Sequence, residues 1–200
     1  MGAYGIMGGT FDPVHFGHLL VAERAREEFG LQRVIFVPAG SPAHKLAWRV
    51  TDAVHRWNMV CLAIGDNAFF QASRIEIERP GPTYSVDTVE EFRRLWPDDE
   101  PYFIVGMDTV GEIPGWHRAQ DLVRLTRFIA ACRPGWDSDP QEALPAGFPA
   151  RIHKVESPLM EISSTDIRER VRQGKSIRYT APAAVVDYIQ ANRLYRDAND

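Results

Sequence analysis

The feature that most constrains the fold is a repeated alternation of short apolar runs with segments of helical spacing. The apolar runs are continuous, as expected for strands buried on both faces, and lie at residues 3–9, 33–38, 101–106 and 127–132. Segments of helical spacing lie between them, at residues 16–30, 51–67 and 85–96, with a shorter one before the run at 127–132. This alternation predicts a Rossmann-like α/β fold, in which a mostly parallel sheet is covered by helices on both faces.

The remaining segments complete this pattern. Residues 69–78, "FFQASRIEIE", alternate apolar and polar side chains and predict a strand, as does "RIHKVESP" at 151–158. The Pro-, Gly- and acid-rich residues 133–149 predict a surface loop, and helical segments begin near Ser164 and Pro182. We expect one domain over residues 1–200, with a small C-terminal helical part at about 163–197.

Composition narrows the classes of partner. A net charge of −4 argues against a broad basic face for nucleic acid, although it allows a local anion pocket. The two cysteines, Cys61 and Cys132, form no CxxC pair, so a disulfide scaffold or a cysteine zinc site is not expected. The sequence has neither a signal-peptide pattern nor an apolar run of membrane-spanning length. We therefore expect a cytoplasmic protein without membrane or nucleic-acid partners, and a homo-oligomer stays open.

The stretch "GGTFDPVHFGH", residues 8–18, follows the first expected strand and leads into a helix. Gly8 and Gly9 let the backbone approach an anion, and the helix N-terminus presents free N–H groups. His15 and His18 share a face if the helix begins near residue 13 or 16, where they can donate to phosphate oxygens. The alternative is a turn in which one histidine caps the helix and the other packs. Two histidines after Gly-Gly-Thr favour the phosphate site.

A second anion site is predicted far along the chain, in "EISSTDIRERVRQG" at residues 161–174. Ser163 with Asp166 is typical of a capping box, which alone would describe an ordinary helix start. Arg168 follows Ser164 by four residues and would project over the same N-terminal turn. A hydroxyl, free N–H groups and a guanidinium there predict a triphosphate site.

These two stretches carry a family resemblance. "GGTFDPVHFGH" resembles the (T/H)xGH motif of the nucleotidyltransferase superfamily, in the form found in bacterial nicotinate-nucleotide adenylyltransferases, and "ISSTDIR" resembles that family's ISSTxIR motif. The resemblance implies transfer of AMP from ATP to nicotinate mononucleotide, which yields nicotinate adenine dinucleotide and pyrophosphate. It implies catalytic roles for His15, His18 and Arg168. It implies ATP binding by Gly8, Gly9, Thr10, Phe11, Ser163 and Ser164.

Further segments resemble the same family and extend the implied site. "PAGSPAHK" keeps His44 and Lys45, and "GPTYSVDT" keeps hydroxyls at Thr83 and Ser85 around Tyr84. In "IVGMDTVGEIPGWH", Gly106 and Asp108 would contact the nucleotide, and Trp116 would stack on the pyridine ring. The implied acceptor-binding residues are His44, Lys45, Thr83, Tyr84, Ser85 and Trp116, and the implied further ATP-binding residues are Gly106, Asp108 and Arg133. Each has an ordinary alternative, such as a solvated Lys45 or a Trp116 that fills a core edge.

The implied chemistry needs no general base, because the phosphate of the acceptor is already ionised. Mg²⁺ is expected to ride mainly on the ATP phosphates, with no metal site built by the protein. Arg56, Met59 and the closing segment at 177–195 are expected to pack rather than to act in catalysis. Two alternatives stay open: an acceptor that is nicotinamide mononucleotide or 4′-phosphopantetheine, and a non-catalytic nucleotide-binding module.

Overall fold

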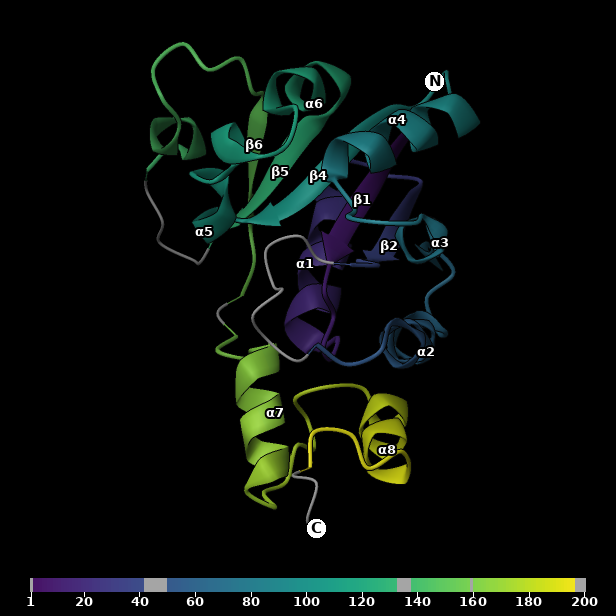
Figure 1. The fold of residues 1–200 in the computed structure, drawn as a ribbon. Coiled ribbons are helices and arrows are strands. Elements are labelled where there is room, and N and C mark those ends of the chain that lie inside the picture. Colours follow the sequence, from purple (N-terminus) through teal and green to yellow (C-terminus); the bar gives the residue numbers. More distant parts are fainter. Residues whose placement is uncertain (1, 42–49, 133–137, 159, 197–200) are drawn as a thin grey trace.

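The computed structural model describes residues 2–41, 50–132, 138–158 and 160–196. In this part of the chain, six strands form one parallel sheet in the order β3-β2-β1-β4-β5-β6 (Figure 1). The strands are β1 Ala3–Gly9, β2 Arg33–Pro38, β3 Phe70–Ala72, β4 Glu100–Gly106, β5 Arg127–Cys132 and β6 Ile152–Glu156. The strand order runs outward from β1 in one direction and from β4 in the other, so the order reverses between these two strands. The predicted Rossmann-like fold is confirmed.

Helices cover both faces of the sheet. They are α1 Phe16–Glu28, α2 Ala53–Ile64, α3 Ile75–Glu78, α4 Ser85–Leu95, α5 Met107–Val110, α6 Ala119–Leu125, α7 Ser164–Arg172 and α8 Ala183–Ala191. Alternate residues of β1 enter opposite cores: Ile6 packs with residues of α4 and α6, whereas Met7 packs with residues of α1, α2 and α8. Burial on both faces explains why the strands read as continuous apolar runs.

The strand predicted over residues 69–78 is wrong beyond its first half. The structure has a strand only at Phe70–Ala72, and Ile75–Glu78 form the short helix α3. The helical turn buries Glu76, which is 8% exposed, and places its carboxylate 2.8 Å from the donating Thr88 Oγ1. An alternation of isoleucine and glutamate cannot reveal this partner, because Thr88 lies on α4.

The loop predicted over residues 133–149 is only partly a surface loop. Its described part contains a 3₁₀ turn at Pro140–Ala143, and the side chains of Pro140 and Leu144 are buried. Leu144 packs into the core on the α4 and α6 face. Its apolar side chain therefore anchors a segment whose composition resembles that of a solvated loop.

The C-terminal helices lie beyond α1 and α2, at the lower end of the molecule in Figure 1. Helix α8 packs against α2, where Tyr188 Oη accepts a hydrogen bond from Asn58 Nδ2 at 2.8 Å and lies 2.9 Å from His55 Nδ1. Among the described residues, no helix is both long enough and apolar enough to cross a bilayer.

Candidate active site

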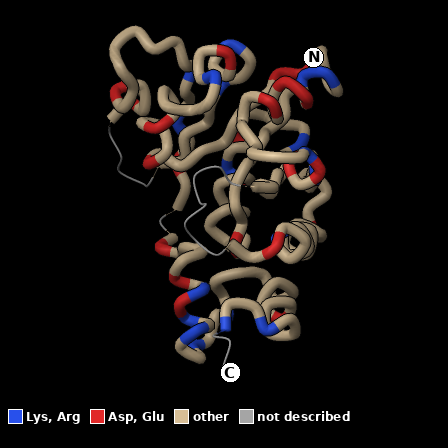
Figure 2. Tube along the Cα trace, viewed as in Figure 1, with Lys and Arg blue, Asp and Glu red and all other residues tan. Residues whose placement is uncertain are grey.

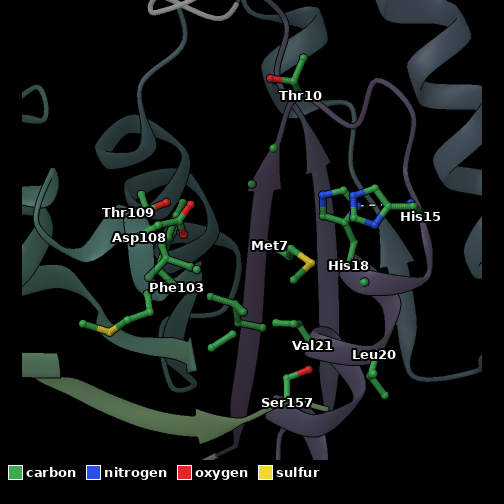
Figure 3. A pocket seen from close by; sticks show the side chains of 18 of the residues that line it. Met7, Thr10, His15, His18, Leu20, Val21, Phe103, Asp108, Thr109 and Ser157 are labelled. Atoms are coloured by element: carbon green, nitrogen blue, oxygen red, sulfur yellow. Dashed lines mark hydrogen bonds between the residues drawn. The ribbon is translucent and has the colours of Figure 1, made fainter. Parts of the chain in front are cut away.

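A cavity of about 790 Å³ opens at the carboxyl ends of β1 and β4, where the strand order reverses. Open parallel sheets bind their ligands at such a point, because the helices that follow the two strands leave in opposite directions. Gly8 and Gly9 at the end of β1 line the cavity, and so do Gly106 and Asp108 after β4. Figure 3 shows Asp108 on one side of β1 and the two histidines on the other.

The histidine pair is tied together at the start of α1. His15 is the N-cap residue, and its backbone N–H donates to His18 Nδ1 at 3.2 Å (Figure 3). The two rings lie against each other with centroids 3.7 Å apart, and the other neighbour of His18 is the Phe11 ring, 5.1 Å away. Because Nδ1 accepts this bond, the proton of a neutral His18 ring resides on Nε2. His18 therefore has one N–H to offer a ligand in the cavity that it lines.

Both histidines are neutral at pH 7. Burial lowers the pKa of His15 to about 4, and burial together with the neighbouring His15 holds the pKa of His18 well below its usual value. The first turn of α1 carries no acidic side chain. Neutral N–H donors beside an unopposed helix N-terminus suit an anion, which would meet no carboxylate from this turn.

The glycine of the Gly-His pair has a steric role. A Cβ added to Gly17 would lie 3.0 Å from the Cε1 and Nδ1 atoms of His15, closer than nearly all real Cβ contacts. A larger residue would therefore require the His15 ring to shift by a few tenths of an ångström. Gly17 thus leaves room for the His15 ring at its observed place against His18.

The second motif folds directly onto the first. Ser164 Oγ donates to the Pro13 carbonyl at 2.8 Å, and Arg168 Nη1 donates to the Asp12 carbonyl at 2.7 Å. Ser163 caps α7, since its Oγ accepts the Asp166 N–H at 3.0 Å. Residues more than 150 positions apart thus form one side of the site. The Ser164 hydroxyl proton is already used, so the helix N–H groups and the remaining Arg168 N–H groups are the donors left for a ligand.

The other predicted residues fall into three groups. Thr10, Thr83, Ser85 and Trp116 line the cavity, with Trp116 edge-on to Phe103 at 5.9 Å. Some predicted residues lie near the cavity but outside its described wall: Phe11, Tyr84, Ser163, Ser164 and Arg168. Phe11 is buried beneath His18, and the Tyr84 ring stacks on His117 at 4.1 Å. His44, Lys45 and Arg133 lie outside the described residues.

Sequence reasoning missed Glu76, an acid in the cavity wall next to Thr83. Burial raises the pKa of Glu76, and hydrogen bonds from Thr88 and Thr83 act against that rise. The described wall contains Glu76 and Asp108 but no lysine or arginine. Several Lys and Arg residues instead lie along α7 and the segment after it (Figure 2), and of these Arg168 binds the first motif. The only available signal for Glu76 was a charged residue between two isoleucines just before "GPTYS".

The described residues contain no group of three or more His, Cys, Asp or Glu side chains placed to hold a metal ion. Asp108 is the one carboxylate near the end of β4 in the cavity wall, at the start of α5. This arrangement places the neutral histidines on one side of β1 and Asp108 on the other.

Comparison with known proteins places this site in a family. The chain matches the cytidylyltransferase-like family over residues 6–170, a range that contains both motifs. The chain belongs to this family. Proteins named probable nicotinate-nucleotide adenylyltransferase are close relatives: the one from Moorella thermoacetica is 51% identical over 100% of this chain and 94% of its own. The one from Saccharopolyspora erythraea is 45% identical over 98% of this chain and 91% of its own.

Solved structures share the fold. The Plasmodium falciparum nicotinic acid mononucleotide adenylyltransferase, complexed with NaAD, matches with a TM-score of 0.81 and 22% identity over 98% of both chains. The predicted family resemblance is confirmed, and so is the predicted class, a nucleotidyltransferase. Nucleotides are therefore the substrates of this family's site. The roles of individual residues stay predictions.

Proposed function

We propose that the chain transfers AMP from ATP to nicotinate mononucleotide and releases pyrophosphate. The observation that carries this proposal is that Ser164 and Arg168 bind the carbonyls of Pro13 and Asp12, in the loop between two residues that line the β1–β4 cavity, Thr10 and His15. These hydrogen bonds bring the N-termini of α1 and α7 close together. A triphosphate needs several hydrogen-bond donors at once, and the free N–H groups of the two N-termini can supply them. The names of relatives over 40% identical along nearly the whole chain support nicotinate mononucleotide as the acceptor.

In the proposed reaction, an oxygen of the acceptor phosphate attacks the α-phosphorus of ATP in line with the departing pyrophosphate. The new P–O bond forms as the bond to the bridging oxygen of the β-phosphate breaks, and the bonding electrons leave with pyrophosphate. No base is required, because the attacking phosphate is already an anion. Catalysis then consists of positioning and charge stabilisation.

The residues take distinct roles in this scheme. The His18 Nε2–H donates to the α-phosphoryl oxygens, where charge must be stabilised during transfer, and His15 contacts the neighbouring phosphate. Arg168 and the N–H groups at the start of α7 hold the β- and γ-phosphates. The Ser85 hydroxyl and the backbone N–H groups of residues 83–85 bind the carboxylate of the acceptor, since the Thr83 hydroxyl already donates to Glu76. Trp116 stacks on its pyridine ring.

Magnesium enters this scheme as part of the substrate, MgATP. A hydrated Mg²⁺ on the phosphates needs few protein ligands, and Asp108 is the described carboxylate suited to orient its water shell or a ribose hydroxyl. Lys45, His44 and Arg133 would add positive charge and polar contacts to the nucleotide or acceptor.

An acceptor panel tests the proposal. Pyrophosphate release is measured with MgATP and, in turn, nicotinate mononucleotide, nicotinamide mononucleotide and 4′-phosphopantetheine. We expect the highest kcat/KM with nicotinate mononucleotide, because its carboxylate can accept hydrogen bonds from the Ser85 hydroxyl and from the backbone N–H groups of residues 83–85. A higher kcat/KM with either other acceptor would reassign the substrate, and release with none of them would leave a nucleotide-binding module.

A further inference from the structure

The loop between β1 and α1 adopts a backbone that it would not hold alone. Phe11 has a φ of 49°, in the left-handed region that side chains other than glycine rarely adopt. Such a conformation costs about 1–3 kcal/mol and persists where surrounding contacts over-determine it. The contacts around the next residue, Asp12, supply that constraint.

Asp12 is 5% exposed and its carboxylate has two donors from distant segments. Its Oδ2 accepts the Thr51 N–H at 3.2 Å, and its Oδ1 accepts the hydroxyl proton of Tyr195 at 2.8 Å. Its backbone carbonyl is the acceptor for Arg168 described above. Nearby, buried Arg56 donates to the Thr10 carbonyl at 2.9 Å.

Tyr195 lies 183 residues from Asp12, in the segment after α8 that was expected only to pack. Its backbone φ is 66°, and that of Arg193 is 49°, so two residues in this turn occupy the left-handed region. Burial and the Asp12 carboxylate raise the pKa of Tyr195, so its hydroxyl remains a donor at every physiological pH. The turn and the packing of the partly buried ring against the core fix the hydroxyl on Asp12.

We propose that Tyr195 is a positioning residue of the active site, acting through Asp12 to hold the loop that carries His15. Removal of its hydroxyl takes one hydrogen-bond donor from the buried Asp12 carboxylate, and the strained loop loses one of its restraints. The histidines follow directly in sequence, so a small shift of the loop displaces the Nε2–H of His18 from the reacting phosphate. This inference rests on the proposed function.

Tyr188 provides a matched control. It lies in the same C-terminal segment, is also partly buried, and its hydroxyl binds Asn58 and lies within hydrogen-bonding distance of His55 on α2. Tyr188→Phe therefore removes a comparable link between the C-terminal segment and the rest of the protein, without touching the loop.

The experiment compares Tyr195→Phe with Tyr188→Phe in steady-state turnover, well below their unfolding midpoints. We expect Tyr195→Phe to lower kcat at least ~10-fold, since displacement by a fraction of an ångström from a near-attack geometry has effects of this order. The KM for nicotinate mononucleotide should stay within about twofold, because its contacts are elsewhere. Tyr188→Phe should keep kcat within about twofold. Equal kcat values in the two variants would overturn the proposal.

A double-mutant cycle with Asp12→Ala identifies the route, because alanine removes the oxygen that accepts the Tyr195 hydroxyl proton. If the hydroxyl acts through Asp12, the double variant should lose no more kcat than Asp12→Ala alone, and additive losses would overturn the proposal. Should Tyr195→Phe not fold, Asp12→Ala against Tyr188→Phe gives the same comparison, and an unchanged kcat in Asp12→Ala overturns it.

The affinity for MgATP, measured by calorimetry without an acceptor, separates this inference from the proposed function. If the unaltered protein releases no pyrophosphate with any acceptor, the proposed function fails. The positioning role is then tested by MgATP affinity alone. Tyr195→Phe should weaken MgATP binding at least ~5-fold relative to Tyr188→Phe, which corresponds to a loss of about 1 kcal/mol of loop restraint. Equal affinities would overturn it.

Discussion

Replacement of His18 can separate two contributions that its imidazole ring makes at once. Nδ1 accepts the His15 backbone N–H at 3.2 Å, and Nε2 carries the proton assigned above to the reacting phosphate. Alanine removes both atoms. Asparagine keeps an acceptor near the position of Nδ1, whereas glutamine places an amide N–H near the position of Nε2. The informative comparison is therefore His18→Asn against His18→Gln.

The magnitudes of the two effects differ. Loss of one preorganised donor to a developing charge costs about 10²–10³ in turnover, or about 2.7–4 kcal/mol. We expect His18→Asn to lower kcat at least ~100-fold and His18→Gln to keep within ~10-fold of the unaltered value. His18→Ala should lose at least ~100-fold too, and should also lose about 1 kcal/mol of stability as the acceptor of the His15 N–H disappears. In a chain of this length that loss lowers the unfolding midpoint by about 2–4 °C.

The assay is pyrophosphate release with saturating MgATP and nicotinate mononucleotide near neutral pH, with unfolding midpoints followed by circular dichroism. Midpoints for the Asn and Gln variants show whether the fold at the start of α1 is preserved. If His18→Asn retains more than a tenth of the kcat while folded, the donor role of Nε2 is wrong. Equal losses for the Asn and Gln variants would mean that the ring acts by shape alone.

Three further predictions concern the burial of His15, the hydrogen bonds of Arg56 and the ring of Trp116. His15 alone should lower the free energy of unfolding by about 3 kcal/mol as pH drops from 6.5 to 4, because it is protonated at about 6.5 in the unfolded chain whereas burial lowers its pKa to about 4 in the folded protein. His18, whose pKa is also lowered, adds to this fall. Urea titrations over this pH range should therefore show a smaller loss of stability for His15→Asn. Arg56→Met should lower the free energy of unfolding by about 3 kcal/mol, because Arg56 is 1% exposed and its side chain donates to three carbonyls. A loss under ~1 kcal/mol in unfolding by guanidinium chloride would contradict this. Trp116→Ala should raise the KM for nicotinate mononucleotide about 10-fold and leave that for MgATP within about twofold; an equal rise in both would refute the stacking role.

The local pattern of apolar and polar residues was sufficient to predict most of the strands and helices. Continuous apolar strands alternate with amphipathic helices, and each of these signals depends only on residues a few positions apart. The failure at residues 73–78 has the same origin, because Ile-Glu-Ile-Glu fits either a strand or a short turn of helix. What decides is Thr88, which meets Glu76 only after α4 has folded against the sheet.

The sequence by itself determined most of the alternation of strands and helices, the glycine turn after β1 and the two motifs predicted to bind phosphate. Only the tertiary structure decided how those motifs contact each other. In the folded protein Arg168 donates to the Asp12 carbonyl, the Ser164 hydroxyl donates to the Pro13 carbonyl, and the His15 backbone N–H fixes the tautomer of His18. It also brings Tyr195 to Asp12 across 183 residues. Periodicity and spacing report on neighbours along the chain, whereas these contacts depend on how the packed sheet and helices place remote segments in space.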